Sequence, residues 1–302
     1  MNKILWIALI VASLFCPGST FANSLPGLPE HLASPFSGIK THHAFSSANE
    51  LGTFFEKAEY NLDQVRKSQL VPQFYVTNLP TDLNKQPVPQ KTSLFVRLLL
   101  PSVVKVNSDI LAVREKLNSL ADKKGDLSAK EQQWLVAIAK DHQGSAEDIQ
   151  DLLKRVDILP VGLIMAQAID ESGWGTSHFA IAGNALYGQH FSSKSKGTFL
   201  TTPGGHVRVA TFDNLYHCTA SYIHNLNTTK AYKQLRNDRA ELRRQHGALS
   251  GHHLAGALIH YSERGQDYVD TLRWMIKHYK LDELNNVQLD KKSTATLIKF
   301  SR

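Results

Sequence analysis

A carboxylic acid near the end of an apolar helix is the clearest candidate for chemistry in this chain. Glu171 stands in the stretch Ala-Ile-Asp-Glu-Ser-Gly-Trp-Gly-Thr-Ser, residues 168–177. Gly173 can adopt a left-handed conformation without steric cost, so the helix should end there and leave Glu171 in its last turn. The negative end of the helix dipole and the adjacent Trp174 both disfavour an ionised carboxylate. The pattern therefore predicts that Glu171 donates a proton near neutral pH.

The helix that must position this acid is almost entirely apolar. Asp157 could serve as its N-cap and Pro160 suits its first turn. Apolar side chains then follow on every face, which predicts a helix buried on all sides; they are Val161, Ile164, Met165, Ala168 and Ile169.

The motif around Glu171 has a second part a few residues later. Glu-Ser-Gly-Trp-Gly-Thr-Ser is followed by Asn-x-Leu-Tyr-Gly at residues 184–188. Together they resemble the bacterial endo-β-N-acetylglucosaminidase family of peptidoglycan hydrolases and autolysins, and the chain is most similar to its Bax-type proteins. The resemblance covers roughly residues 145–282. It implies a mainly α, lysozyme-like catalytic domain with a small β-hairpin lobe facing the helices, Glu171 as general acid, and no cofactor.

The second catalytic group is harder to find in the sequence. Glycosidases with two carboxylates place them about 5 Å apart for retention and about 6.5–9.5 Å apart for inversion. No Asp or Glu occurs in residues 172–212, and Asp213 is the first acid after them, where it would equally make an N-cap for the next helix. Glu263 and Asp170 are weaker candidates for a base.

A substrate-assisted route remains open, in which the 2-acetamido oxygen of the sugar attacks the anomeric carbon while Glu171 protonates the leaving oxygen. Such a route needs a polar group that orients the acetamide. Tyr261 is the candidate, because Tyr-Ser-Glu-Arg-Gly-Gln-Asp-Tyr at residues 261–268 resembles the second motif of the family. Tyr268 shares an apolar helix face with Leu272 and Ile276, and is predicted to belong to the core.

Substrate contacts are predicted from residue types that suit sugars. Sugar rings have apolar faces that stack on aromatic rings, and their hydroxyl groups bind amides. Trp174, Asn184, Tyr187 and Gln189 are therefore expected to line the substrate cleft, although Asn184 could equally be a structural turn residue. Ala185 stands where the family usually has a second Asn, which puts one substrate contact in doubt.

These observations predict cleavage of the β-1,4 bond of peptidoglycan on the N-acetylglucosamine side. A muramidase or lytic transglycosylase on the same scaffold is the nearest alternative. A non-catalytic glycan-binding module is a third possibility, since it would explain the missing second acid. Peptidoglycan glycan strands are the expected partner in all three cases.

The first 22 residues predict export. Lys3 precedes the apolar run 4–15, and Thr-Phe-Ala at 20–22 is a small-residue cleavage site. The run is too short to span a membrane, so a periplasmic or otherwise exported product without an integral membrane segment is expected. Cleavage would remove Cys16 and leave Cys218 alone, which excludes an intrachain disulfide and favours a buried small hydrophobic residue.

The net charge and the spacing of the histidines indicate which ligands the chain is expected to bind. The formal net charge of +7 suits an anionic polymer, but basic residues do not cluster with aromatic ones into a nucleic-acid motif, so no nucleic acid is expected. Histidines gather at His246, His252, His253 and His260 without a Cys partner or a His-Glu-x-x-His pattern, and no metal is expected there.

Helical periodicity predicts the rest of the architecture. Residues 1–22 form the signal peptide, 23–127 a helical N-terminal region with an extended arm, 128–284 the catalytic domain and 285–302 a tail. In the N-terminal region, the pattern predicts a helix at 50–69, an irregular stretch at 70–92, and two helical segments at 95–100 and 109–120 that are separated at Pro101. In the catalytic domain, it predicts a capping box at Ser128 and Glu131, a hairpin at 197–212, and helices at 215–226, 231–236, 253–260 and 267–279.

Overall fold

A computed structural model describes residues 25–123, 125–190, 197–202, 204–245 and 247–301. The signal peptide predicted for residues 1–22 lies outside this part. Helices dominate the described chain, and the α-helices are α1 (Ala48–Lys57), α2 (Leu62–Ser68), α3 (Val88–Ala121), α4 (Ala129–Asp141), α5 (Ile149–Arg155), α6 (Val161–Ser172), α7 (His178–Gly183), α8 (Leu215–Thr228), α9 (Lys233–Arg244), α10 (Gly251–Leu254) and α11 (Gln266–His278). Five short 3-10 helices accompany them: η1 (Pro29–His31), η2 (Leu83–Lys85), η3 (Lys230–Tyr232), η4 (Ala255–Leu258) and η5 (Leu281–Leu284). The mainly α class predicted from the sequence is confirmed.

Strands are few and short within the described residues. They are β1 (Thr41–Phe45), β2 (Leu70–Val71), β3 (Phe74–Val76), β4 (Thr198–Thr201), β5 (Arg208–Thr211), β6 (Gln288–Leu289) and β7 (Thr296–Phe300). β7 lies between β1 and β3 and is parallel to both, with Thr296 opposite Thr41 and Phe74. β2 and β6 form a second parallel pair. The C-terminal segment therefore completes a sheet whose other strands come from the N-terminal region.

The predicted hairpin is present and packs on α7. β4 and β5 are antiparallel, with Thr198 opposite Thr211. The hairpin packs on α7 so closely that a Cβ added at Gly183 would lie 2.5 Å from the Thr211 methyl carbon. This contact requires a residue without a side chain at position 183, and it fixes the hairpin relative to the segment that follows Glu171.

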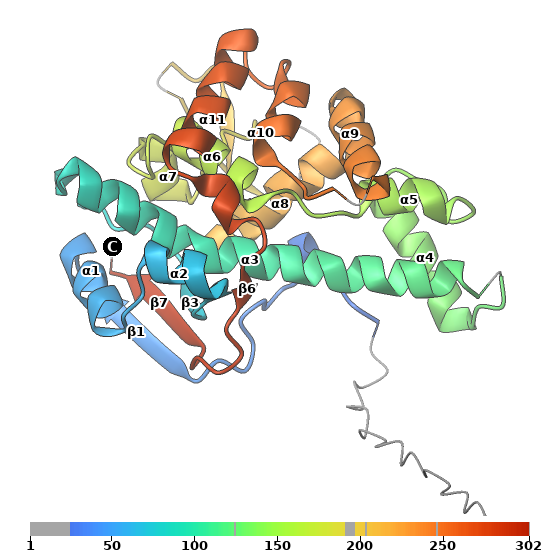
Figure 1. Cartoon of the computed structure of the whole chain (residues 1–302), viewed down its shortest axis with the longest axis horizontal. Coiled ribbons are helices and arrows are strands. Elements are labelled where there is room, and N and C mark those ends of the chain that lie inside the picture. Colours follow the sequence, from blue (N-terminus) through green and yellow to red (C-terminus); the bar gives the residue numbers. More distant parts are fainter. Residues whose placement is uncertain (1–24, 124, 191–196, 203, 246, 302) are drawn as a thin grey trace, which may run out of the picture.

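The long helix α3 organises the molecule. Figure 1 shows it running between the three-stranded sheet with α1 and α2 on one side and α6, α7, α10 and α11 on the other, and α3 contacts β3, α6 and α8. The break predicted at Pro101 does not occur. The helix α3 is continuous through Pro101 and has 34 residues in total, a length of about 51 Å. Pro101 is buried, so packing on both sides compensates for the single backbone hydrogen bond that proline removes.

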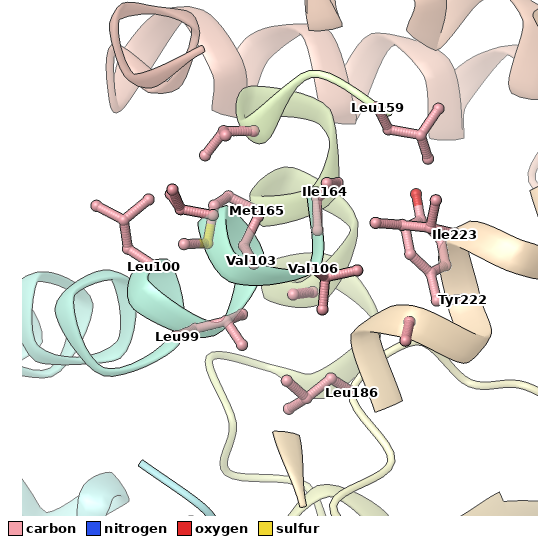
Figure 2. Close-up of a cluster of buried hydrophobic side chains, with 14 of the residues drawn as sticks. Leu99, Leu100, Val103, Val106, Leu159, Ile164, Met165, Leu186, Tyr222 and Ile223 are labelled. Carbon is pink, nitrogen blue, oxygen red and sulfur yellow. The ribbon is translucent and has the colours of Figure 1, made fainter. Parts of the chain in front are cut away.

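The core that holds the catalytic helix lies where α3, α6 and α8 meet. Figure 2 shows Val103 and Val106 of α3, Ile164 and Met165 of α6 and Ile223 of α8 pointing toward one another. All five are 0% exposed. Full burial of an aliphatic side chain contributes about 1.5–3 kcal/mol, so this cluster fixes α6 against two other helices.

Two predictions for the N-terminal region are corrected by the structure. The helix predicted at 50–69 is divided into α1 and α2, because Glu59 adopts a left-handed conformation and Asn61 begins a new helix by accepting a hydrogen bond from the Gln64 N–H. The stretch 70–92, predicted to be irregular, contains β2, β3 and the start of α3, where Pro87 is the N-cap.

Two further predictions concern single features. The capping box is confirmed, since the side chains and backbone N–H groups of Ser128 and Glu131 bond reciprocally at the start of α4. Cys218 is buried and unpaired as predicted, and burial raises the pKa of its thiol to about 12, which makes it a poor nucleophile. None of the helices in the described part of the chain has the length and apolar character needed to span a membrane.

Candidate active site

The catalytic helix α6 begins differently from the prediction. Pro160 is its N-cap, and the N–H of Gly162 is satisfied by Asn285 Oδ1 at 2.9 Å. Asp157 does not cap the helix. It is 2% exposed, and both its oxygens accept hydrogen bonds from Arg243 at 2.6 Å. A buried ion pair thus holds the segment that leads into α6.

The helix ends as predicted, in a tight left-handed turn. Gly173, Trp174 and Gly175 have φ angles of 56°, 62° and 72°. The N–H of Trp174 donates to the Ile169 carbonyl at 3.1 Å, so the turn satisfies carbonyls that the helix leaves open. Three successive residues in this conformation reverse the chain immediately after Glu171, which explains why the motif needs glycine on both sides of the tryptophan.

Glu171 itself is half-buried and has one hydrogen-bond donor among the residues that the structure describes. The hydroxyl group of Tyr268, at the start of α11, donates to Glu171 Oε1 at 2.9 Å. On the other oxygen, a Cβ added at Gly188 would lie 3.1 Å from Oε2. The glycine of the second motif part therefore keeps the space beside Oε2 free of a side chain.

The environment favours the protonated acid. Burial raises the pKa of Glu171, and the neighbouring charge of Asp170 raises it further. The Tyr268 hydrogen bond and the Arg264 guanidinium oppose this shift without reversing it. The direction of the shift is the predicted one, and burial is its largest cause. That Glu171 donates a proton to a substrate stays a prediction.

Tyr268 belongs to a group of tyrosines whose rings stack on or face one another, and we name Tyr187, Tyr222, Tyr232, Tyr261 and Tyr268 the tyrosine cluster. The rings of Tyr261 and Tyr268 stack with centroids 5.6 Å apart, and those of Tyr187 and Tyr222 stack at 4.0 Å. Desolvation and the Glu171 charge both raise the pKa of Tyr232 and of Tyr261. The cluster therefore stays protonated, and Tyr232, Tyr261 and Tyr268 are its members that interact with Glu171.

A buried hydrogen-bond chain links this cluster to the acid. Tyr222 donates to Gln167 Oε1, Gln167 Nε2 donates to the Tyr268 oxygen at 2.9 Å, and Tyr268 donates to Glu171. Gln167 is one helical turn before Glu171 and is 0% exposed. Neither Gln167 nor the polar role of Tyr268 was predicted from the sequence. A single amide in an otherwise apolar helix, and a tyrosine on an apolar face, are signals that could have found them, because buried polar groups need partners.

Trp174 is half-buried and packs on two other aromatic rings. Its ring makes edge contacts with Phe95 of α3, at 6.1 Å, and with Tyr279, at 4.8 Å. A Cβ added at Gly175 would lie 2.6 Å from the Phe95 ring, so the turn and α3 are in close contact. The tyrosine cluster contacts Glu171 directly through Tyr268, whereas Trp174 anchors the turn.

The other side chains predicted to line the cleft differ in how far they are exposed. Asn184 is 2% exposed, is the left-handed C-cap of α7 and donates to the Phe212 carbonyl at 2.9 Å. Tyr187 is 1% exposed and its hydroxyl bonds Thr219. Both are thus held in the interior, where they have almost no surface for a sugar. Gln189 is partly exposed and donates to Ser221 at 3.2 Å.

Tyr261 lies beside Glu171 as the second motif predicted. Its hydroxyl donates to the Tyr187 carbonyl at 2.8 Å, so its proton is used within the protein. The lone pairs of the same oxygen can still accept a hydrogen bond. Tyr261 therefore offers an acceptor close to the acid.

The acids considered as the second catalytic group have surroundings that differ from those of Glu171. Asp170 pairs with Arg264 at 2.8 Å, and the Arg264 guanidinium also lies over the Tyr268 ring. Glu263 is exposed in the loop before α11. Asp213 is exposed and lines a surface hollow with the arm residues 33–37. The N-cap of α8 is Asn214 rather than Asp213, since Asn214 accepts from the His217 N–H.

The histidines that are close together in the sequence do not form a group of metal ligands among the described residues. His246 lies outside the described residues, and His252, His253 and His260 are exposed. Converging donor atoms were found elsewhere among the described residues, on η1, α4 and α8; the side chains are Glu30, Asp141, His142 and His224.

Comparison with known proteins agrees with these features. Residues 146–281 match the family described as mannosyl-glycoprotein endo-beta-N-acetylglucosaminidase. Protein bax of Escherichia coli (strain K12) is 32% identical over 220 residues, which cover 70% of this chain and 75% of that protein. The catalytic domain of the autolysin Auto from Listeria monocytogenes is 16% identical, with a TM-score of 0.32 over 55% of this chain and 96% of that domain.

The family match spans α6, the hairpin, the tyrosine cluster and α11, so it contains both Glu171 and its hydrogen-bond donor Tyr268. It agrees with the lysozyme-like catalytic domain predicted from the motif. The chain therefore belongs to the glucosaminidase family of glycoside hydrolases, and within it to the Bax-type proteins.

Proposed function

We propose that this protein is a peptidoglycan hydrolase that cleaves the β-1,4 bond on the N-acetylglucosamine side, with Glu171 as the general acid. The observation that carries the proposal is the environment of Glu171, which is half-buried, has a single donor and has a raised pKa. A glycosidase acid must be protonated when substrate binds, and burial of this kind is how proteins achieve it.

The two oxygens of Glu171 have different tasks in this proposal. Oε1 is oriented by the Tyr268 hydroxyl, whereas Oε2 lies beside Gly188. The proton that reaches the substrate is therefore carried on Oε2. A side chain at position 188 would occupy the space that the leaving oxygen needs.

The nucleophile in the proposed reaction is the substrate's own acetamide. Asp170 is paired with Arg264, and Asp213 and Glu263 are exposed, so none of these acids shares the buried surroundings of Glu171. The acetamide oxygen forms a bond to the anomeric carbon while the bond to the leaving oxygen breaks and Glu171 gives that oxygen its proton. Water then opens the oxazoline ring, and the Glu171 carboxylate accepts the proton from water.

Tyr261 orients the acetamide in this scheme. The Tyr261 hydroxyl already donates a hydrogen bond to the Tyr187 carbonyl, so its oxygen acts as an acceptor for the acetamide N–H. A hydrogen-bond acceptor at the N–H increases the electron density of the amide, which makes the acetamide oxygen the better nucleophile. The rigid stacking of Tyr261 on Tyr268 keeps the acceptor and the acid in one geometry.

The proposed substrate also agrees with the charge and the predicted export of the chain. The formal net charge is +7, which favours an approach to the carboxylates of peptidoglycan stems. A signal peptide at residues 1–22 would bring the enzyme to the periplasm, where that polymer lies.

Digestion of purified peptidoglycan tests the proposal. The chain without residues 1–22 should release muropeptides whose reduced ends are glucosaminitol, identified by mass spectrometry after borohydride reduction. Glu171→Gln should lower the rate by about 10²–10⁴-fold, because general acid catalysis contributes that much. Asp213→Asn is the matched control and should leave the rate within a few-fold of the wild type.

Each other outcome identifies an alternative. Anhydromuramic ends would indicate a lytic transglycosylase, and reduced muramic acid ends a muramidase. Binding to sacculi without soluble products from either form would indicate a glycan-binding module. A loss of activity in Asp213→Asn as large as that in Glu171→Gln would replace the acetamide mechanism by one with two carboxylates.

A further inference from the structure

Four side chains from three separate segments point their donor atoms at one another. They come from η1, from the C-terminal end of α4 and from α8. The atoms are Glu30 Oε1, Asp141 Oδ2, His142 Nδ1 and His224 Nδ1, and all four lie within 4.8 Å of one another. We name these four residues the Glu30 cluster.

The facing atoms of the Glu30 cluster lack hydrogen-bond partners. Each of the four is buried and has no partner among the described residues. The His142 side chain is almost completely buried, since the residue is 3% exposed. His224 Nδ1 lies 2.7 Å from Glu30 Oε1, yet the two are not aligned as a hydrogen bond. Buried polar atoms are nearly always satisfied, so four unsatisfied atoms facing one point require an explanation.

We propose that the Glu30 cluster is a binding site for a divalent cation of the zinc type. Two imidazole nitrogens and two carboxylate oxygens form a donor set that Zn²⁺ accepts in tetrahedral sites. Zinc–ligand bonds of about 2.0–2.1 Å place neighbouring donors about 3.3 Å apart. The Asp141 Oδ2 atom lies 3.4 Å from His142 Nδ1 and 3.5 Å from His224 Nδ1. Two carboxylates would also neutralise the charge of the ion.

A fifth residue supports the ligand geometry from outside. His31 Nε2 lies 2.6 Å from Asp141 Oδ1, the oxygen that does not face the other donors. Such a contact fixes which carboxylate oxygen faces the ion, as partners of metal ligands commonly do. Asp141 Oδ1 thus contacts His31, and Asp141 Oδ2 is left to bind the ion.

The site would be structural, because the protein supplies four ligands and leaves no position for substrate. Its ligands connect the N-terminal arm to two helices of the main body. The arm is already held there by two hydrogen bonds, from Trp134 Nε1 to the Pro26 carbonyl at 2.8 Å and between His217 Nε2 and the Leu32 carbonyl at 2.7 Å. A bound ion at Glu30 would fasten the arm between these two points.

Zinc binding by the full chain, purified through a histidine-free tag, tests this site. After removal of metal with a chelator, equilibrium dialysis against Zn²⁺ should give one ion per chain, and the melting temperature should rise with zinc concentration. His224→Gln should abolish the bound equivalent and the rise in melting temperature. Tetrahedral coordination predicts visible d–d absorption when Co²⁺ replaces Zn²⁺.

The matched control is His217→Gln, on the same helix and in contact with the same arm but outside the Glu30 cluster. It should keep one zinc per chain. His31→Gln should weaken zinc binding by about 10- to 100-fold. Should His224→Gln fail to fold, Glu30→Gln replaces it. Equal zinc binding by the wild type and either cluster variant, or no bound equivalent in the wild type, would overturn the proposal and identify the cluster as an ion pair. These outcomes do not depend on Glu171 or on glycosidase activity.

Discussion

Two glutamates at opposite kinds of helix end have opposite electrostatic surroundings. Glu131 lies in the first turn of α4, where its side chain closes a capping box with Ser128. Lys116 and Lys123 contact its Oε1 atom at 2.7 and 2.8 Å. These hydrogen bonds, together with those from Ser128, hold the pKa of Glu131 far below its usual range. Glu131 is therefore a structural anion at the positive end of a helix dipole.

Glu171 lies in the last turn of α6, at the negative end of the dipole. One tyrosine hydroxyl is its only hydrogen-bond donor among the described residues, and the nearest charge on its own helix is the anion Asp170. Burial raises the pKa here, whereas the lysine contacts lower it at Glu131. The same side chain thus has a lowered pKa in one place and a raised pKa in the other. Burial at Glu171 and the lysine hydrogen bonds at Glu131 are the largest causes of this difference.

Exchange of each glutamate for glutamine should separate the two roles, and this is the largest effect we expect. Glu171→Gln should lower kcat for peptidoglycan by about 10²–10⁴-fold, since the amide cannot donate the proton. Glu131→Gln should retain kcat within a few-fold, because Gln preserves the capping box and only removes the charge. Initial rates on the same peptidoglycan preparation measure both. Similar losses in the two variants would show that Glu171 matters for folding and not for proton transfer.

Local patterns in the sequence predicted the helix end that carries the acid. The apolar run before Glu171, the glycine at 173 and the later hairpin are each encoded within about a dozen residues, and all are present in the structure. The three-stranded sheet was missed, because β7 pairs with β1 across about 255 residues of sequence and its strands are only three to five residues long. Such short strands have no periodicity long enough to read.

The candidate site was predicted in part for the same reason. The acid follows from its own helix, but the Tyr268 hydroxyl reaches it from 97 residues away. The apolar neighbours of Tyr268 correctly indicated a core position, yet they carry no signal about where its hydroxyl points. Asn184 and Tyr187 were expected at the substrate because of their residue types, whereas the structure uses them to close α7 and to pack on α8. Contacts between distant segments decide these roles.

Removal of the single donor to Glu171 should sharpen the contrast with Glu131, with a smaller effect. Tyr268→Phe eliminates the hydrogen bond that lowers the pKa of Glu171, so the acid should stay protonated to higher pH. The basic limb of the kcat/KM profile should therefore move to higher pH. Loss of orientation should reduce the maximum rate by roughly tenfold at most, the value of one hydrogen bond.

Tyr222→Phe is the control for this change. It removes the other hydroxyl that bonds Gln167 but leaves the Tyr268 contact with Glu171 in place. Its basic limb should coincide with that of the wild type. A shift of the limb to lower pH in Tyr268→Phe would mean that the hydroxyl acts on the protonated acid instead of the carboxylate.

The smallest expected effect is on thermal stability, and its sign should differ between the two glutamates. A folded-state pKa above the unfolded value means that the Glu171 carboxylate destabilises the fold once the pH exceeds the unfolded value of about 4.3. Glu171→Gln should therefore melt a few degrees above the wild type at pH 8, and this difference should vanish as the pH falls toward 4. The folded-state pKa of Glu131 is depressed, so its anion stabilises the fold above about pH 4.3 and this contribution is lost in acid. Glu131→Gln should accordingly melt below the wild type at pH 8. Calorimetric scans at the two pH values measure both differences. A Glu171→Gln variant that melts below the wild type at pH 8 would show that the fold stabilises the carboxylate, and Glu171 would then lack the property that makes it an acid.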